Sequence, residues 1–166
     1  MIKYVNGDLF MSDADVICHQ VNCQGVMGSG VAKQVREKYP TVFLYYKALC
    51  DNDKRIMREL ALTNTTLLGK AQIVSKKDYY VGEVQDKQKI ANLFAQENYG
   101  YDGKCYTDYD ALRRALAYVN EKFSGGTVAM PYLMGCHRGG GDWEIVLKII
   151  EETLTDCDVT LYKYTG

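Results

Sequence analysis

The feature of this sequence that most constrains its fold is a pair of glycine-rich segments, each lying between a predicted strand and a predicted helix. Glycine at such positions indicates that the backbone approaches another group closely or adopts a positive φ. Two such loops can direct backbone N–H groups at one anion, and the following helix dipoles favour negative charge there. The segments are residues 22–32 and 132–142, with glycines at Gly25, Gly28, Gly30, Gly135, Gly139, Gly140 and Gly141.

Neither segment is a common nucleotide-binding motif. The first lacks the Gly-Lys-Ser/Thr ending of a Walker A loop, and its glycine spacing is not GxGxxG. Taken alone, it is also compatible with a tight strand-to-helix turn. The second loop, which follows a different strand, favours a diphosphate site over that simpler interpretation.

Hydrophobic periodicity predicts strands that alternate with helices along the chain. Alternation of this kind favours a three-layer α/β domain whose ligand lies beyond the carboxyl ends of the strands. Thr107 or Asp108 is the expected N-cap of the third helix. The predicted strands are 2–5, 14–20, 71–75, 79–84, 89–94, 127–130 and 159–164, of which 79–84 is either an edge strand or a turn. The predicted helices are 31–39, 42–49, one that begins at 109 and ends near Gly125 and Gly126, and 143–154.

Length and charge narrow the class of protein further. The 166 residues fit a single domain covering 1–166, and we expect a monomer. The balance of 20 basic and 21 acidic residues argues against a non-specific duplex-binding surface. The sequence shows no secretory signal and no apolar run of membrane-spanning length, so we expect a cytoplasmic protein without a membrane partner.

The cysteines and histidines do not form a metal-binding pattern. With no CxxC pair, the six cysteines are expected to be reduced thiols, and neither His19 nor His137 has metal-ligand spacing. We therefore expect neither a metal nor another cofactor. The cysteines are Cys18, Cys23, Cys50, Cys105, Cys136 and Cys157.

Four segments, in order and at suitable spacing, resemble the macrodomain family. Gly-Asp-Leu-Phe at 7–10 is similar to the family's Gly-Asp-Ile/Leu element, and residues 19–25 with 28–32 resemble its first ligand loop. Residues 130–143 resemble its second. The resemblance is strongest to the branch of terminal ADP-ribose protein glycohydrolases, DNA de-ADP-ribosylating antitoxins and fungal-type ADP-ribose-1''-phosphate phosphatases. It implies a three-layer α/β/α fold with a mixed central sheet.

The resemblance also implies a ligand, ADP-ribose or ADP-ribose-1''-phosphate, either free or attached to protein or nucleic acid. Asp8 would accept a hydrogen bond from the adenine amino group, Tyr162 or else Tyr164 would stack on adenine, and Asn22 would lie beside the distal ribose. The implied ligand-binding set is Asp8, Leu9, Asn22, Gly25, Met27, Gly28, Ser29, Gly30, Val31, Met134, Gly135, Cys136, His137, Arg138, Gly139, Gly140, Gly141 and Tyr162.

The chain departs from the family's glycohydrolases at two catalytic positions. Their lysine and aspartate align with Gln96 and Gly139, which offer neither an amine nor a carboxylate. His19, Lys104 and Asp142 are the candidate replacements. For each a structural alternative stays open: a histidine at a strand end, a solvated loop lysine, and the N-cap of the following helix, respectively.

Two functions are therefore compatible with the sequence. The resemblance implies hydrolysis of a group from the distal ribose, either a phosphate monoester or an attachment to protein or nucleic acid. The departures at Gln96 and Gly139 favour the alternative of a module that binds ADP-ribose without turnover.

Overall fold

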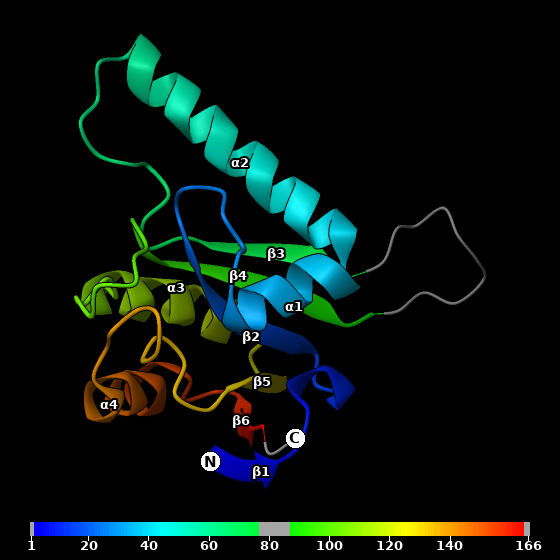
Figure 1. Cartoon of the computed structure of the whole chain (residues 1–166). Coiled ribbons are helices and arrows are strands. Elements are labelled where there is room, and N and C mark those ends of the chain that lie inside the picture. The colour runs from blue at the N-terminus through cyan, green and yellow to red at the C-terminus, as the bar shows by residue number, and fades with distance from the viewer. Residues whose placement is uncertain (1, 77–86, 165–166) are drawn as a thin grey trace.

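The computed structural model describes residues 2–76 and 87–164, and over these ranges a mixed sheet lies between two pairs of helices (Figure 1). The strand order is β1-β6-β5-β2-β4-β3, with β3 antiparallel to β4 and the other pairs parallel. The strands are β1 Ile2–Asn6, β2 Val16–Asn22, β3 Ala71–Ser75, β4 Lys89–Gln96, β5 Thr127–Pro131 and β6 Asp158–Lys163. The helices are α1 Gly30–Lys38, α2 Pro40–Glu59, α3 Tyr109–Lys122 and α4 Trp143–Thr153. The predicted α/β/α layers and mixed sheet are confirmed.

Alternate residues of β2 enter different cores. Ile17 and Val21 pack under α1 and α2, whereas Val16 and Cys18 pack under α3 and α4. Side chains of a strand alternate between the two faces of a sheet. The continuously apolar start of β2 is therefore buried on both sides, as expected of a central strand.

The predicted helices and strands differ from the observed ones mainly at their ends. The second helix was expected to end near residue 49, but α2 continues to Glu59. Its added turns carry few apolar residues, and instead Asp53 accepts hydrogen bonds from Thr65 and Thr66 of the following loop. Asp108, one of the two expected N-caps, accepts a hydrogen bond from the Ala111 amide. The strand predicted at 79–84 lies outside the described residues.

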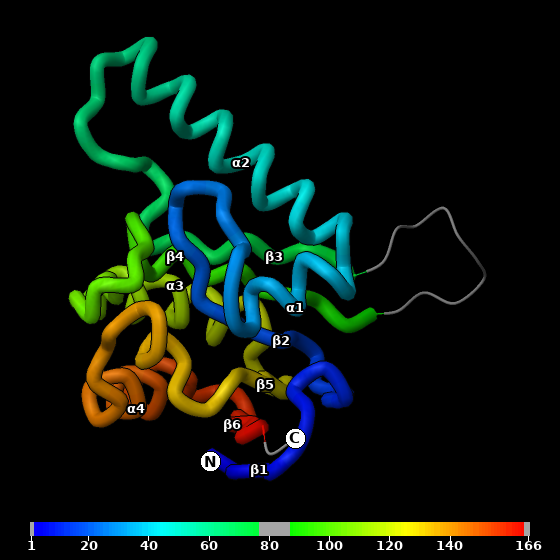
Figure 2. Tube along the Cα trace, in the orientation of Figure 1, coloured from blue at the N-terminus to red at the C-terminus, as the bar shows by residue number. Residues whose placement is uncertain are grey.

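The sheet opens between β2 and β5. Pairing between these strands ends at Ile17 and Ala129, while β2 remains paired with β4 as far as Asn22 and Gln96. The strand order also reverses at β2. The next two strands along the chain, β3 and β4, lie on one side of β2, whereas β5 and β6 lie on its other side. A crevice at such a switch point is the usual ligand site of open α/β sheets. Figure 2 shows the loops after β2, β4 and β5 leaving the sheet on the same side.

None of the helices in 2–76 and 87–164 is both long and apolar enough to cross a bilayer.

Candidate functional site

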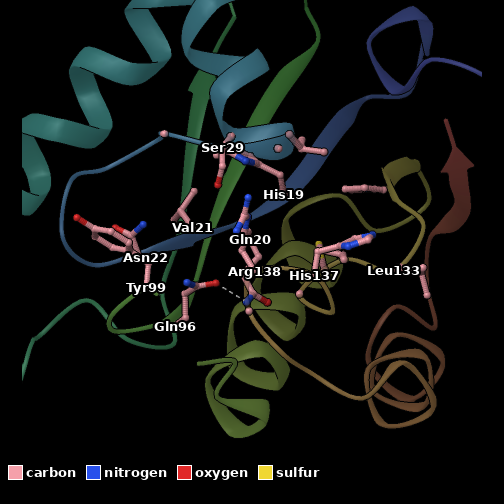
Figure 3. A pocket seen from close by; sticks show the side chains of 18 of the residues that line it. His19, Gln20, Val21, Asn22, Ser29, Gln96, Tyr99, Leu133, His137 and Arg138 are labelled. Atoms are coloured by element: carbon pink, nitrogen blue, oxygen red, sulfur yellow. Dashed lines mark hydrogen bonds between the residues drawn. The ribbon is translucent and has the colours of Figure 1, made fainter. Parts of the chain in front are cut away.

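A cavity of about 410 Å³ lies at the carboxyl ends of β2, β4 and β5 (Figure 3). It is bounded by the loop between β2 and α1, the loop after β4, and the loop between β5 and α4. The structure thus brings together most of the two glycine-rich segments. The predicted residues that line the cavity are His19, Asn22, Gly28, Ser29, Gly30, Val31, Met134, Gly135, His137, Arg138 and Gly139.

The N-terminus of α1 faces this cavity. Ser29 is the N-cap, yet its side chain makes no capping hydrogen bond, and Gly30 begins the helix at φ +58°. No acidic residue occupies the first turn. The first-turn N–H groups and the helix dipole therefore suit an anion at this point.

The side chain of Asn22 shapes the first loop. Its Nδ2 donates to the Val26 carbonyl at 2.8 Å, and its Oδ1 accepts from the Gln24 amide at 2.9 Å. The Tyr46 hydroxyl donates to the same oxygen at 2.8 Å. Asn22 is thus held from three sides, which fixes the loop, and its contact with a distal ribose stays a prediction.

Positive φ angles shape the second loop. Gly135 and Gly140 lie at +77° and +64°, and Leu133 lies at +61°, an unusual conformation for a residue with a side chain. Backbone held in this region costs about 1–3 kcal/mol and often occurs at ligand sites. Alternating conformations of this kind turn successive N–H groups toward one point, as in an anion-binding nest.

Gly139 has no room for a side chain. A Cβ there would lie 2.5 Å from Thr107 Oγ1 and 2.6 Å from the Gly135 carbonyl oxygen. The Gly139 carbonyl accepts from the amides of Tyr106 and Thr107 at 2.7 and 2.9 Å. The second loop is thereby packed onto the start of α3, and a carboxylate at this position would not fit.

Gln96 is linked to the second loop through a chain of side-chain hydrogen bonds. Gln20 Nε2 donates to Gln96 Oε1 and to Thr107 Oγ1, both at 2.8 Å. Thr107 in turn donates to the Gly135 carbonyl at 2.8 Å. Gln96 Nε2 donates to the Asn98 carbonyl at 2.9 Å. Gln96, the position where the resemblance implies a lysine, is thus held by hydrogen bonds to Gln20 and to the Asn98 carbonyl, and Figure 3 shows it facing Gln20.

His19 lies in the cavity wall and is only 1% exposed. Its Nε2 is 2.6 Å from Asn92 Oδ1. Burial lowers the pKa of His19 to about 4, although the hydrogen bond with Asn92 acts in the opposite direction. The ring is therefore neutral at pH 7, which argues against a role for His19 as a general acid.

Arg138 carries the cationic charge of the cavity wall. Among the described residues that line the cavity there is no Asp or Glu. The Arg138 guanidinium lies 4.2 Å from the centre of the Tyr101 ring, a cation–π contact that joins the second loop to the loop after β4. The charge of the wall therefore favours an anionic ligand.

Sequence reasoning missed several residues of the wall. Gln20, Tyr99 and Tyr101 line the cavity without having been assigned, as do 131–133. The polar and aromatic composition of 96–104 was a signal, since long loops of this kind are often functional. Gln20 gave no signal, because its partners are distant in the sequence.

Two of the three catalytic candidates do not line the cavity. Lys104 points to solvent, with its side chain 77% exposed and Nζ 3.7 Å from Asp102. Asp142 is the N-cap of α4, where its Oδ1 accepts from the Glu144 amide at 2.9 Å. The structural alternatives for these residues fit their positions, because both side chains already have partners.

Several predicted ligand residues also lie away from the cavity wall. Met27 is buried in the core under α1 and α2, and Gly25 lies beside α2, where an added Cβ would be 3.3 Å from Lys47 and 3.5 Å from Cys50. Cys136, Gly140 and Gly141 belong to the second loop but lie outside the wall.

The residues expected to contact adenine lie at the short helix after β1 and on β6. The Asp8 carboxylate caps a short 3-10 helix, η1 Leu9–Met11, by accepting from the Phe10 amide at 2.9 Å, and Leu9 is buried. Tyr162 on β6 is the register partner of Pro131, which lines the cavity. None of Asp8, Leu9 and Tyr162 lines the cavity, so their contacts with adenine stay predictions.

Comparisons with known proteins agree with this arrangement. No family model matches the chain. The DNA ADP-ribosyl glycohydrolase of Mycobacterium tuberculosis (strain ATCC 25618 / H37Rv) is 29% identical over 170 residues, which cover 100% of this chain and 43% of that protein. The ADP-ribose 1''-phosphate phosphatase of Aspergillus fumigatus is 42% identical over 52 residues, 31% of this chain and 26% of that protein. The solved macrodomain of Mycobacterium tuberculosis DarG matches with a TM-score of 0.68 and 26% identity, over 98% of this chain and 97% of that one.

A three-layer domain with a cavity at the switch point of its sheet is typical of α/β domains that bind ligands beyond the carboxyl ends of their strands. Within that class, the relatives and solved structures that match over the length of the chain include macrodomains, which the chain resembles in both sequence and fold. The chain spans less than half the length of the glycohydrolase that it matches.

Proposed function

We propose that this macrodomain binds ADP-ribose and hydrolyses a substituent from the distal ribose of an ADP-ribose derivative. One observation carries the proposal. The N-terminus of α1, the second glycine-rich loop and Arg138 line one cavity, whose described wall residues include no carboxylate. That combination suits the two negative charges of a diphosphate.

The proposed orientation follows from the two ends of the cavity. The diphosphate lies between Ser29 and Gly135, where both loops offer N–H groups. Adenine lies toward Tyr162 and Asp8, beyond the β5 side of the cavity. The distal ribose then lies toward Asn22 and His19, at the end of β2.

Nucleic acid is the proposed acceptor from which ADP-ribose is released. The DNA ADP-ribosyl glycohydrolase relative matches the whole chain, whereas the phosphatase relative matches 52 residues. In the proposed reaction water adds at the anomeric carbon of the distal ribose, the bond to the acceptor breaks, and the acceptor takes up a proton. Tyr99 and Tyr101, which are 44% and 66% exposed beside the cavity, offer aromatic faces to nearby bases.

Binding without turnover is the second candidate function. It is favoured by Gln96, which is bound by hydrogen bonds where the family's glycohydrolases use a lysine, and by Gly139, where a side chain does not fit. We further propose a monomeric single domain in the cytosol, which the six free cysteines favour.

Two measurements test the proposal. Calorimetry with ADP-ribose tests the cavity, and the variant Ser29→Ala should weaken binding by removing the N-cap hydroxyl, which makes no capping hydrogen bond. Incubation with ADP-ribosylated single-stranded DNA, ADP-ribosylated protein and ADP-ribose-1''-phosphate then tests turnover. Release of ADP-ribose from DNA is the expected result. Binding without product on any substrate supports the second candidate, and no binding at millimolar ADP-ribose overturns both.

A further inference from the structure

A row of polar side chains crosses three strands on the sheet face covered by α1 and α2. His19 on β2 and Gln72 on β3 are both register partners of Asn92 on β4. His19 Nε2 lies 2.6 Å from Asn92 Oδ1, and Asn92 Nδ2 donates to Gln72 Oε1 at 3.0 Å. The row ends in α2, where Gln72 Nε2 donates to the Tyr45 carbonyl oxygen at 3.2 Å.

The backbone carbonyl at the end gives this row a direction. A carbonyl oxygen only accepts hydrogen bonds, so the amide of Gln72 must turn its nitrogen to Tyr45 and its oxygen to Asn92. Asn92 must then turn its nitrogen to Gln72 and its oxygen to His19. The nitrogen of His19 that meets this oxygen must therefore carry the proton.

The other nitrogen of His19 is left as an acceptor. Burial keeps the ring neutral, and a neutral imidazole with a protonated Nε2 has a lone pair on Nδ1. Nδ1 is buried and has no hydrogen-bond partner among the described residues. Because Nε2 meets Asn92 of β4, Nδ1 lies on the edge of the ring that is turned away from Asn92, and pairing of β2 with β5 has already ended at Ile17. His19 itself is one of the residues that line the cavity (Figure 3).

Hydrogen bonds also fix the orientation of the side-chain amide of Gln20, the next residue of β2, through a separate set of partners. The Asn98 carbonyl orients Gln96, whose oxygen therefore accepts from Gln20. The Gly135 carbonyl orients the Thr107 hydroxyl, which also accepts from Gln20. Gln20 Oε1 is left buried and without a partner among the described residues. Two successive residues of β2, whose side chains lie on opposite faces of the sheet, thus each keep a buried acceptor without a partner among the described residues.

We propose that the Asn92–Gln72 row fixes His19 as the Nε2–H tautomer, so that Nδ1 selects a hydrogen-bond donor of the ligand, a sugar hydroxyl, and rejects a phosphate oxygen. Asn92 and Gln72 are positioning residues, and His19 determines specificity. This inference rests on the proposed function and narrows its substrate class. A phosphate monoester would bring negatively charged acceptor oxygens against the lone pair, whereas the distal ribose of a glycosidic derivative brings hydroxyl groups.

Nitrogen NMR of the ring in unliganded protein at pH 7 tests the tautomer. The chain has two histidines, so His137→Gln assigns the signals. The expected result is a protonated Nε2 and an unprotonated Nδ1 in His19, and saturating ADP-ribose should shift Nδ1 in the direction of hydrogen-bond acceptance. A protonated Nδ1 in the free protein overturns the inference. If the tautomer is as expected but millimolar ADP-ribose does not bind, the proposed function and the hydroxyl selection fail, while the control of the tautomer stands.

Two variants test whether the row sets the tautomer. Asn92→Asp places a negative charge against Nε2 and should protonate the whole ring, which turns Nδ1 into a donor and weakens ADP-ribose binding by about tenfold. Asn52→Asp on the exposed face of α2 is the matched control. Gln72→Leu at the half-buried end of the row frees the Asn92 amide to turn, and we expect a mixture of tautomers. An unchanged tautomer in both row variants overturns the inference.

Discussion

His19 Nε2 lies 2.6 Å from Asn92 Oδ1, and the two residues are register partners on adjacent parallel strands. Both are buried, with exposed fractions of 1% and 0%. A histidine in this position meets one amide oxygen and no carboxylate, so little offsets the loss of water around a charged ring. Burial of the ring therefore favours its neutral form in the folded protein, although the hydrogen bond with Asn92 partly offsets this effect.

Stability should accordingly fall in mild acid. Burial lowers the pKa of His19 from 6.5 to about 4 in the folded protein. Between these values the unfolded chain binds more protons than the folded one, so the free energy of unfolding rises with pH through this window. The full difference corresponds to about 3 kcal/mol.

Urea unfolding from pH 4.5 to 7 measures this effect. His19→Gln, compared with the wild type at each pH, should remove the histidine's part of the slope. His137→Gln leaves His19 intact and should keep the wild-type dependence. Parallel curves for wild type and His19→Gln would contradict the argument.

A side chain at Gly139 should disrupt the second loop. In Gly139→Ala the new Cβ meets the Gly135 carbonyl and Thr107 Oγ1, and overpacking of this kind costs about 1–3 kcal/mol. We expect lower stability by urea unfolding and weaker ADP-ribose binding by calorimetry. Gly7→Ala, whose Cβ would make an ordinary 3.8 Å contact with Val5, is the control. Equal stability of the two variants would contradict the prediction, because it would mean that the second loop can shift to accommodate a side chain at Gly139.

The glycine-rich loops and most strands could be predicted because their signals are local. Gly30 and Gly135 adopt positive φ, which is a property of single residues, and the apolar run of β2 reflects burial on both faces. The length of α2 was not predictable from its apolar pattern, since Asp53 is held by residues of a later loop.

The polar partners in the cavity wall were beyond sequence reasoning for a related reason. Asn92 meets His19 only because β2 and β4 are neighbours in a particular register, and Gln20 meets Thr107 across 87 positions of sequence. A one-residue change of register would turn these side chains to the other face. Such pairs need the sheet topology before they can be recognised.

Substitution of Asp142 separates capping from catalysis. Asn is as good an N-cap as Asp, so Asp142→Asn should retain both stability and turnover if the carboxylate only caps α4. Asp142→Ala should lose about 1 kcal/mol of stability. Turnover of ADP-ribosylated DNA that disappears in Asp142→Asn, with unchanged unfolding, would instead assign the carboxylate to the chemistry.

Removal of Arg138 should weaken ligand binding. Hydrogen bonds to charged groups contribute about 1.5–3 kcal/mol, so Arg138→Ala should lower the affinity for ADP-ribose by about 10- to 100-fold. Arg138→Lys keeps the charge but loses the planar guanidinium and its stacking on Tyr101. Its affinity for ADP-ribose should therefore lie between those of the wild type and Arg138→Ala. Calorimetry at two salt concentrations should show a weaker salt dependence for Arg138→Ala than for the wild type.

The control and a second variant make this test specific to the cavity. Arg55→Ala removes an exposed cation of α2 that pairs with Glu59, and it should leave the affinity unchanged. Tyr101→Ala keeps the charge of Arg138 but removes the ring beneath it, and should weaken binding less than Arg138→Ala. If Arg138→Ala binds ADP-ribose as tightly as Arg55→Ala, the guanidinium does not contact the diphosphate, and the two loops must hold it through backbone N–H groups alone.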